Sequence, residues 1–335
     1  MSIISNRQTT NETCLPALLW NQTSIDNRRP SLYVCIIAVL THSIFWFQLV
    51  ICPTVRQKSM QWLYAYLITD ILLLIRFFVT FIVHTTTYEC IVNQTWSAFV
   101  CYTEAALDNY LNITEVYILL ALNLCRYAQI VFNRNVYVAN FKLIILAHLS
   151  IYLMPLISLI IQIYSGAAQV TKYPGESCDV TYTNIYVKIF NVALAFVLPI
   201  LLNVGVIAAS IRHIHLTSQL RQAQHHISAR EKYHRSLVIQ FFIFYTIWLL
   251  LWSPNVIVYQ FTTGTSKITL IPALLNYIEI ALDPLIIGAL DVRFYQAWKH
   301  IWLEFRNRRL RRLQIEQRRI GPTTIETTMQ LRRQK

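Results

Sequence analysis

Long apolar runs, separated by short polar segments, make up most of the chain. A helix needs about 20 predominantly apolar residues to cross the hydrocarbon core of a membrane, which is about 30 Å thick. Seven runs reach that length, at residues 31–52, 60–84, 98–130, 141–164, 185–211, 235–262 and 268–290. The pattern therefore predicts an all-α membrane protein, a seven-transmembrane-helix bundle over residues 31–290.

The segments on either side of this bundle are polar. Residues 1–30 contain no hydrophobic run, so we expect an extracellular N-terminal tail and no cleavable signal peptide. Residues 291–312 carry large apolar side chains at helical spacing among Arg and Lys, namely Phe294, Trp298, Ile301, Trp302 and Phe305. This stripe predicts an amphipathic helix in the membrane interface, with a calmodulin target as the alternative. Residues 313–335 are predicted to form a disordered cytoplasmic tail.

Composition and charge narrow the function classes. Charged residues make up 13% of the chain, whereas soluble domains usually carry about 25%. Most Lys and Arg lie in segments that would be cytoplasmic if the N-terminus were outside, the orientation that basic loops favour. The net charge of +13 would then face anionic membrane lipid. Nucleic acid is disfavoured because the basic residues lie at helix ends, so we expect a multi-pass plasma-membrane protein with an extracellular N-terminus.

Sequons and cysteines support this orientation. Cys101 and Cys178 lie on the predicted outer side, where oxidation is allowed, as do Cys14 and Cys90, which could form a second bridge. Asn112 matches a sequon inside the third span, where we do not expect a glycan. Three further glycosylation sequons fall on the outer side, at Asn11, Asn21 and Asn93.

Arg126 lies in the sequence LNLCRY, at the inner end of the third apolar span. A permanently charged guanidinium at that depth is costly and therefore marks a functional site. Asp108 lies about five helical turns earlier, roughly 27 Å away, in the outer half of the same span. Asn112 follows one turn later on the same face. A buried carboxylate at Asp108 needs a cationic partner.

Four acids form a second constellation within apolar spans: Asp70, Glu115, Glu279 and Asp283. Four carboxylates at this depth cannot all be ionised without cations. A bound cation such as sodium, one or two protonated carboxyls, or a proton relay would each resolve this conflict. We expect at least one to exchange its proton near neutral pH, and sodium to alter activity or ligand affinity.

Several motifs occur in a fixed order along the chain: Asp70 in LITDILLL, Leu-Cys125-Arg126-Tyr127, Pro199 in FVLPILL, Trp252-Ser-Pro254, Asp283-Pro284 and Phe294. In this order and spacing they resemble the motifs of rhodopsin-class G-protein-coupled receptors across the whole membrane domain. The resemblance implies a receptor that binds an extracellular ligand and activates a heterotrimeric G protein, with arrestin as a further partner. It also implies a disulfide between Cys101 and Cys178.

The resemblance assigns roles residue by residue. Arg126 and Tyr127 would take part in G-protein coupling, and a sodium ion would lie near Asp70. Asp108 would be the counter-ion of an amine, with Tyr277 as its hydrogen-bond partner. The alternative for Asp108 is an internal salt bridge or a hydrogen bond to Tyr277 alone. The conformational switch would comprise Trp252, Pro254, Asp283 and Pro284. Trp252 could instead be a plain core aromatic, or share its role with Trp248.

Some positions depart from the family pattern. Cys125 replaces the acid that holds the arginine in inactive relatives, and His234 stands where many relatives carry a second acid. Ile287 and Ile207 replace two tyrosines that help to hold the active state. These changes predict a weakly latched receptor with raised basal activity, unless the lost tyrosines weaken the active state equally.

The ligand site is predicted in the outer half of the bundle. Amine receptors carry paired aromatics after the helix-six proline, but Asn255 and Val256 stand there, so the aromatic cage that ammonium favours is poor. A peptide with a basic group is therefore favoured over a small amine. The predicted ligand contacts are Asp108, Asn109, Asn112, Asn191, Asn255, Tyr259 and Tyr277.

Other function classes fit the sequence less well. The buried acids also suit a seven-helix ion or proton transporter. A membrane hydrolase is disfavoured, because His42, His84 and His148 are scattered and lack metal-ligand spacing. We therefore expect no enzymatic activity and no cofactor beyond a sodium ion.

Overall fold

The computed structural model describes most of the chain, at residues 19–52, 55–56, 60–86, 94–132, 137, 141–172, 177–222, 229–261, 267–290 and 292–320. Side chains are not described at residues 94, 172, 218–222, 229–237, 256–261, 267–269, 292–293, 298, 300 and 314–320. The predicted glycosylation sites Asn11 and Asn93, the cysteines Cys14 and Cys90, and the side chains of His234 and Tyr259 fall outside this description.

The prediction of seven membrane spans is confirmed for the described residues, which hold 7 helices long and apolar enough to cross a membrane. The helices are α1 (Gln22–Ile51), α2 (Gln61–Thr86), α3 (Gln94–Phe132), α5 (Phe141–Tyr164), α8 (Ala229–Phe261) and α9 (Lys267–Leu290), with a fifth span built from α6 (Ile185–Val192), a π-helical turn (Ala193–Val197) and α7 (Leu198–Gln222). Many Leu, Ile and Phe side chains are exposed along them, as expected of helices that face lipid.

Several helices extend beyond their predicted bounds, including the fifth span, which reaches Gln222, and the sixth, which begins at Ala229. α1 begins at Gln22, within the stretch predicted as a tail, because the side chain of Asn21 caps it by accepting a hydrogen bond from Ser24 N at 2.7 Å. At the other end, α10 (Val292–Ile320) continues past residue 312. The added residues, LQIEQRRI, include Leu, Gln, Glu and Arg, which favour helix even without an apolar face.

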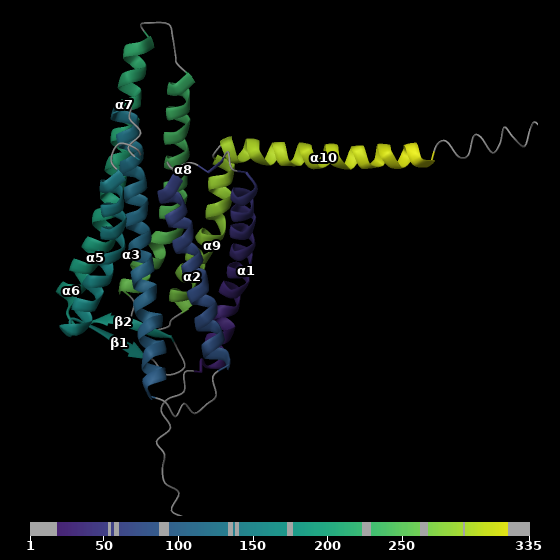
Figure 1. Cartoon of the computed structure of the whole chain (residues 1–335). Helices are drawn as coiled ribbons and strands as arrows, with labels where there is room; N and C mark the ends of the chain where they lie inside the picture. Colours follow the sequence, from purple (N-terminus) through teal and green to yellow (C-terminus); the bar gives the residue numbers. More distant parts are fainter. Residues whose placement is uncertain are drawn as a thin grey trace, which may run out of the picture.

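A short antiparallel hairpin, β1 (Ala168–Lys172) and β2 (Cys178–Tyr182), connects the fourth and fifth spans and was not predicted. The disulfide between Cys101 and Cys178 is confirmed, with a Cα–Cα distance of 5.1 Å. It fastens β2 to the first turns of α3. Figure 1 shows this hairpin at the end of the bundle opposite α10. We call these the disulfide end and the Arg126 end.

The membrane helices pack as neighbours in a closed bundle. α9 packs against both α1 and α8, and α3 packs against both α2 and α7 (Figure 1). Large aromatic side chains fill the interior, and Trp62, Tyr66, Trp248, Trp252 and Phe294 are fully buried. The fold thus places residues of α1, α2, α3, α8 and α9 around one central column.

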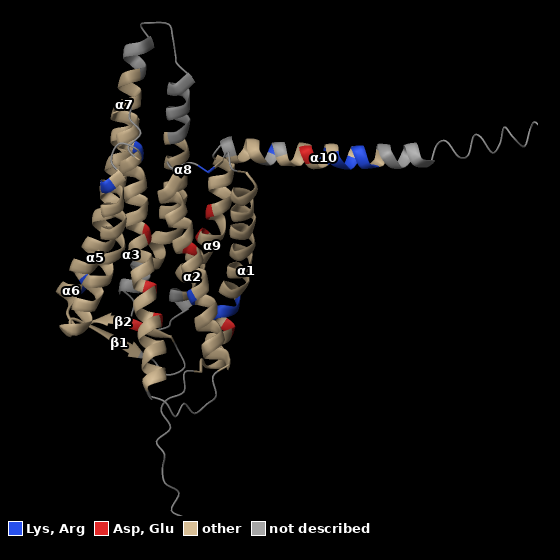
Figure 2. Ribbon diagram, in the orientation of Figure 1, with Lys and Arg blue, Asp and Glu red and all other residues tan. Residues whose placement is uncertain are grey.

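α10 leaves the bundle at the Arg126 end and runs across the direction of the other helices (Figure 1). Its first turn is anchored, since Phe294 stacks on Phe45 at 4.9 Å and its carbonyl accepts a hydrogen bond from Gln48 Nε2 at 2.9 Å. Beyond this anchor, Trp302 and Phe305 are exposed among basic residues (Figure 2). This arrangement fits the amphipathic interfacial helix that the sequence predicts.

Candidate functional site

At the disulfide end, Asp108 forms an internal salt bridge with Arg76. Arg76 Nη1 lies 2.5 Å from Asp108 Oδ1, and the two side chains are 15% and 26% exposed. Asn112 Nδ2 donates to the carbonyl of Asp108 at 2.8 Å and to its Oδ1 at 3.3 Å. Tyr277 lies beside both members of the pair. The cationic partner required by Asp108 is therefore supplied from α2 within the chain.

A second polar pair, formed by His84 and Glu104, lies next to the Arg76–Asp108 pair. His84 Nε2 is 2.9 Å from Glu104 Oε2, and that oxygen also accepts the backbone N–H of Cys178 at 3.2 Å. Trp20 covers His84, stacking on its ring at 4.7 Å, and the Arg28 guanidinium lies 4.3 Å from the centre of the Trp20 ring. These contacts join Trp20, α1, α2, α3 and the hairpin at the disulfide end of the bundle.

The predicted asparagines divide into two groups. Asn109 Nδ2 donates to Tyr182 Oη at 3.1 Å, and Asn191 exchanges two hydrogen bonds with Gln162, at 2.9 and 2.8 Å. These amides hold the hairpin and α6 in place, with only 6% and 9% of the two residues exposed. Asn255 is half-buried on α8. The structure therefore brings Asp108, Asn112 and Tyr277 together, whereas Asn109 and Asn191 serve internal contacts.

Asp179 on β2 also lies at the disulfide end. Burial raises the pKa of its carboxyl to about 7, and the nearby charge of Asp108 adds to this shift. A hydrogen bond from Val180 N at 2.9 Å and the positive charge of Arg76 act in the opposite direction. Asp179 can therefore change its charge near neutral pH, close to the Asp108 pair.

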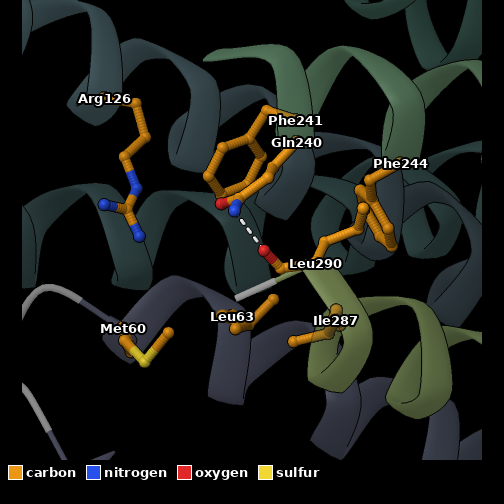
Figure 3. Close-up of a pocket in the computed structure, with 8 residues that line it drawn as sticks. All are labelled: Met60, Leu63, Arg126, Gln240, Phe241, Phe244, Ile287 and Leu290. Carbon is orange, nitrogen blue, oxygen red and sulfur yellow. Dashed lines mark hydrogen bonds between the residues drawn. The ribbon is translucent and has the colours of Figure 1, made fainter. Parts of the chain in front are cut away.

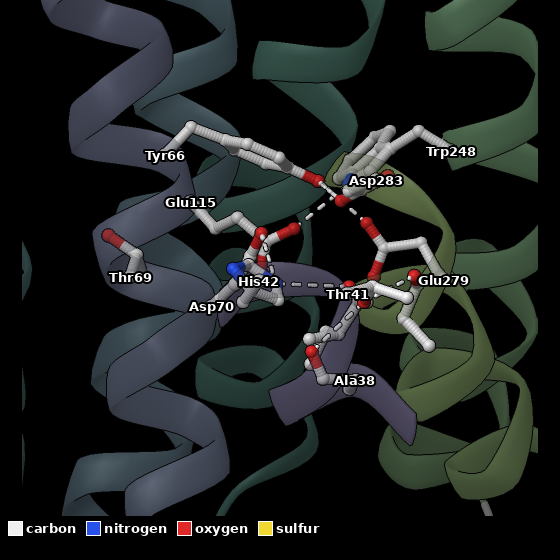
Figure 4. A network of polar contacts seen from close by, with 12 residues as sticks. Ala38, Thr41, His42, Tyr66, Thr69, Asp70, Glu115, Trp248, Glu279 and Asp283 are labelled. Atoms are coloured by element: carbon white, nitrogen blue, oxygen red, sulfur yellow. Dashed lines mark hydrogen bonds and ion pairs between the residues drawn. The ribbon is translucent and has the colours of Figure 1, made fainter. Parts of the chain in front are cut away.

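The four predicted acids do meet in the middle of the bundle (Figure 4). Tyr66 Oη lies 2.6 Å from Glu279 Oε1 and also hydrogen-bonds Asp283 Oδ2. Glu115 Oε1 accepts a hydrogen bond from Trp248 Nε1 at 2.9 Å. Asp70 is fully buried, and neither of its oxygens has a hydrogen-bond partner among the described residues. His42 Nε2 lies 4.0 Å from Asp70 Oδ2.

Carboxyl oxygens suit a hard cation such as sodium, and the orphaned oxygens of Asp70 leave ligand capacity unused. Among the described residues, no group of three or more His, Cys, Asp or Glu side chains is arranged to hold a metal ion. The sodium ion therefore stays a prediction for this cluster.

At the Arg126 end, the side chain of Arg126 on α3 faces α8, and the residue is 6% exposed. Its guanidinium carbon is 5.1 Å from the centre of the Phe241 ring. Gln240 Nε2 donates to the carbonyl of Leu290, which joins α8 to the end of α9 (Figure 3). Together they line a pocket with Met60, Leu63, Phe244 and Ile287. On the other side of Arg126, Asn123 Nδ2 donates to Asn203 Oδ1 at 2.7 Å and joins α3 to α7.

A disulfide-fastened hairpin at one end, a buried arginine at the other and acids between them agree with the family that matches the sequence. The model of the 7 transmembrane receptor (rhodopsin family) covers residues 48–286. The chain belongs to the rhodopsin family of seven-transmembrane receptors. A comparison with curated proteins gave no match. Family membership makes this chain a signalling receptor, with an extracellular ligand and a G protein as the partners that the family implies.

The predicted switch residues of the receptor lie between its two ends. Trp252 is fully buried, stacks on Trp248 at 4.6 Å and contacts Phe196 at 5.3 Å. Pro254 and Pro284 lie inside α8 and α9, where each removes a backbone donor. Because Trp248 also holds Glu115, the aromatic pair connects α8 to the central acids.

Sequence reasoning missed some residues that the receptor structure brings into the site. Arg76 lies in an apolar span, and the argument applied to Arg126 applies to it equally. Tyr66 and Gln162 gave no such signal, because a lone polar group in a span is common and its partner lies on another helix. The hairpin had a signal in the alternating segments AQVTK and CDVTY.

Proposed function

We propose that the protein is a plasma-membrane receptor that binds an extracellular ligand at the Asp108 site and activates a heterotrimeric G protein at Arg126. The observation that carries this proposal is the arrangement of the two ends. A polar, partly exposed ion pair lies below the hairpin at one end, and a pocket around Arg126 lies at the other. Arg126 and Tyr127 provide the coupling surface, which arrestin would share.

The proposed orientation puts the N-terminus and the disulfide end outside. Asn21, one of the predicted glycosylation sites, is exposed at this end and caps α1 through its Oδ1. A glycan is attached to the amide nitrogen, so the cap and the modification are compatible. The basic residues of α10 gather at the opposite end, where they would meet anionic cytoplasmic lipid (Figure 2).

The ligand that we favour is a peptide with a basic group, with a small amine next. A cationic ligand group that takes Asp108 must compete with Arg76, which is already paired with it. Breaking a largely buried pair leaves the remaining charge uncompensated. A peptide has more contacts than a small amine with which to offset that cost. Asn255, Tyr259 and Tyr277 would contribute polar contacts from α8 and α9.

The test is nucleotide exchange on purified G proteins, with the receptor in lipid nanodiscs and a panel of cationic peptides and amines. An active ligand should lose affinity on Asp108→Asn and lose agonist-driven exchange on Arg126→Ala, with surface expression kept. Asp26→Asn is the matched control, because Asp26 is exposed on α1. Agonist-driven exchange that survives Arg126→Ala would remove the coupling role.

The central acids also fit the rival function of ion or proton transport. We propose that they instead make the receptor sensitive to sodium or pH, since family membership favours signalling. Currents or pH changes in cells that express the chain, without ligand, would favour transport. Ligand affinity that is independent of sodium between about pH 5 and 8 would remove the regulatory role.

A further inference from the structure

Arg28, near the start of α1, is a half-buried cation that has no carboxylate partner. Its guanidinium carbon lies 4.3 Å from the centre of the Trp20 ring. The next residue, Arg29, pairs with Asp26 at 3.3 Å, whereas Arg28 forms no salt bridge among the described residues. Contact with a ring face engages the charge of a guanidinium but leaves its five N–H donors available. Arg28 can therefore still bind an anion.

The acids near Arg28 are already engaged by other groups. Arg28 lies close enough to Glu104, Asp108 and Arg76 for their charges to act on it. Asp108 pairs with Arg76 at 2.5 Å, and Glu104 Oε2 accepts hydrogen bonds at 2.9 and 3.2 Å. Basic and acidic residues of α1, α2 and α3 lie near one another at the disulfide end (Figure 2). Arg28 thus places a second guanidinium near Arg76 that none of these acids pairs with.

The two guanidiniums balance the two carboxylates at this end of the bundle. Asp179 is a third acid there, but it is only partly ionised near neutral pH, because burial raises its pKa to about 7. A cationic ligand group that displaces Arg76 from Asp108 leaves Arg76 largely buried without a counter-charge. An anion bound to Arg28 alone adds an uncompensated negative charge beside the acids. A ligand that brings both charges avoids both costs.

We propose that Arg28 and Arg76 together bind a carboxylate of the ligand while Asp108 binds its basic group. The two ion pairs of the complex replace the single pair of the free receptor, so every charge keeps a partner. A guanidinium presents a planar fork of N–H donors that matches the two oxygens of a carboxylate. The Arg76 side chain is 15% exposed and Arg28 is half-buried, so both are open to a ligand from outside.

The geometry also limits the spacing of the two ligand charges. Arg76 Nη1 and Asp108 Oδ1 lie 2.5 Å apart, so a short ligand reaches both. A single carbon separates the ammonium and the carboxylate of an α-amino acid. Tyr277 lies beside the pair, and its ring centre is 4.9 Å from that of Phe77, so an aromatic side chain of the ligand has apolar contacts here. The ligand class is therefore a zwitterion, either an amino acid or a peptide with a carboxylate next to its basic group.

The test is thermal unfolding of the full-length chain in phosphatidylcholine nanodiscs, with three probes that share one skeleton. Free phenylalanine carries both charges, phenylalaninamide carries only the cation, and hydrocinnamate carries only the carboxylate. A probe that binds the folded receptor raises its melting temperature with increasing concentration. Phenylalanine should bind about tenfold more tightly than either analogue, because each analogue lacks one charge-assisted contact.

Variants of α1 assign the carboxylate contact. Arg28→Gln should weaken phenylalanine binding about tenfold without weakening phenylalaninamide binding, since only the carboxylate uses Arg28. Arg28→Lys keeps the charge but not the fork and should recover part of the affinity. Arg29→Gln is the matched control, because Arg29 is exposed and already paired with Asp26. Trp20→Leu keeps the guanidinium and should preserve the phenylalanine response.

Three outcomes would overturn the proposal: no response to phenylalanine, equal responses to phenylalanine and phenylalaninamide, or a phenylalanine response that survives Arg28→Gln. Loss of the response in Trp20→Leu and Arg28→Gln alike would also do so, because Arg28 would then act only by holding Trp20. That the zwitterion is the agonist rests on the function proposed above. These measurements contain no G protein, so binding without nucleotide exchange in the separate assay would keep the carboxylate site and remove the proposed function.

Discussion

Arg76 and Asp108 form an ion pair across α2 and α3, with 2.5 Å between Nη1 and Oδ1. In the receptor family, an aspartate in this part of helix three suggests a counter-ion for an amine ligand. In this chain, Arg76 already compensates the charge of Asp108. The proposed ligand site would therefore contain a pre-formed ion pair, which binding would have to rearrange.

Loss of one member of this pair should destabilise the receptor. Asp108→Asn leaves the Arg76 guanidinium largely buried without its counter-charge, at a cost of about 1.5–3 kcal/mol. The double variant Arg76→Gln with Asp108→Asn should recover most of that loss, because two neutral amides can hydrogen-bond each other. Thermal unfolding of the purified receptor measures both. The single variant Arg76→Gln completes the cycle, and a double-variant loss equal to the sum of the two single losses would show that the pair contributes no coupling energy.

The Arg126 end should be held closed by contacts that replace the missing acid latch. Phe241 lies over the Arg126 guanidinium, and Gln240 joins α8 to the Leu290 carbonyl. A hydrogen bond contributes about 1 kcal/mol, so Gln240→Leu should raise basal nucleotide exchange about fivefold. Phe241→Leu removes a cation–π contact of about 0.5–1 kcal/mol and should raise it about two- to fivefold.

Thr246→Val is the control for these variants. Thr246 lies exposed on α8 and hydrogen-bonds only within its own helix among the contacts described, to the Phe242 carbonyl at 2.7 Å. It should leave basal exchange unchanged. If Gln240→Leu and Phe241→Leu behaved like this control, closure of α8 would depend on other contacts.

The disulfide should contribute strongly to the stability of the disulfide end. It joins Cys101 and Cys178 over a sequence separation of 77 residues. Removing a bridge over a loop of this size costs about 2–5 kcal/mol. Cys178→Ser should lower the melting temperature, because the backbone N–H that donates to Glu104 remains but the covalent link between β2 and α3 is lost. An unchanged melting temperature under oxidising conditions would contradict this role.

The membrane spans could be read from the sequence because length and apolarity are physical requirements for crossing a bilayer. Arg126 was recognised for the same reason, since its charge conflicts with its surroundings. Pairings between helices could not be read in this way. Which face of α2 meets α3 depends on the rotation of each helix about its axis. The pairing of Arg76 with Asp108 is therefore set by tertiary packing and cannot be read from either helix alone. The same holds for Tyr66, whose two acid partners lie on α9.

Asp179 should make the stability of the disulfide end depend on pH. Its folded pKa of about 7 lies above the usual value of 3.8, because burial and the charge of Asp108 disfavour the ionised form. The stabilisation from its protonated form is therefore full below about pH 4 and is lost as pH rises through about 7. Asp179→Asn should flatten the dependence of the melting temperature on pH between these values. Parallel profiles for the variant and the wild type would show that Asp179 titrates normally.

The same ionisation of Asp179 should strengthen binding of a cationic ligand above pH 7, which the pH dependence of affinity in Asp179→Asn would test.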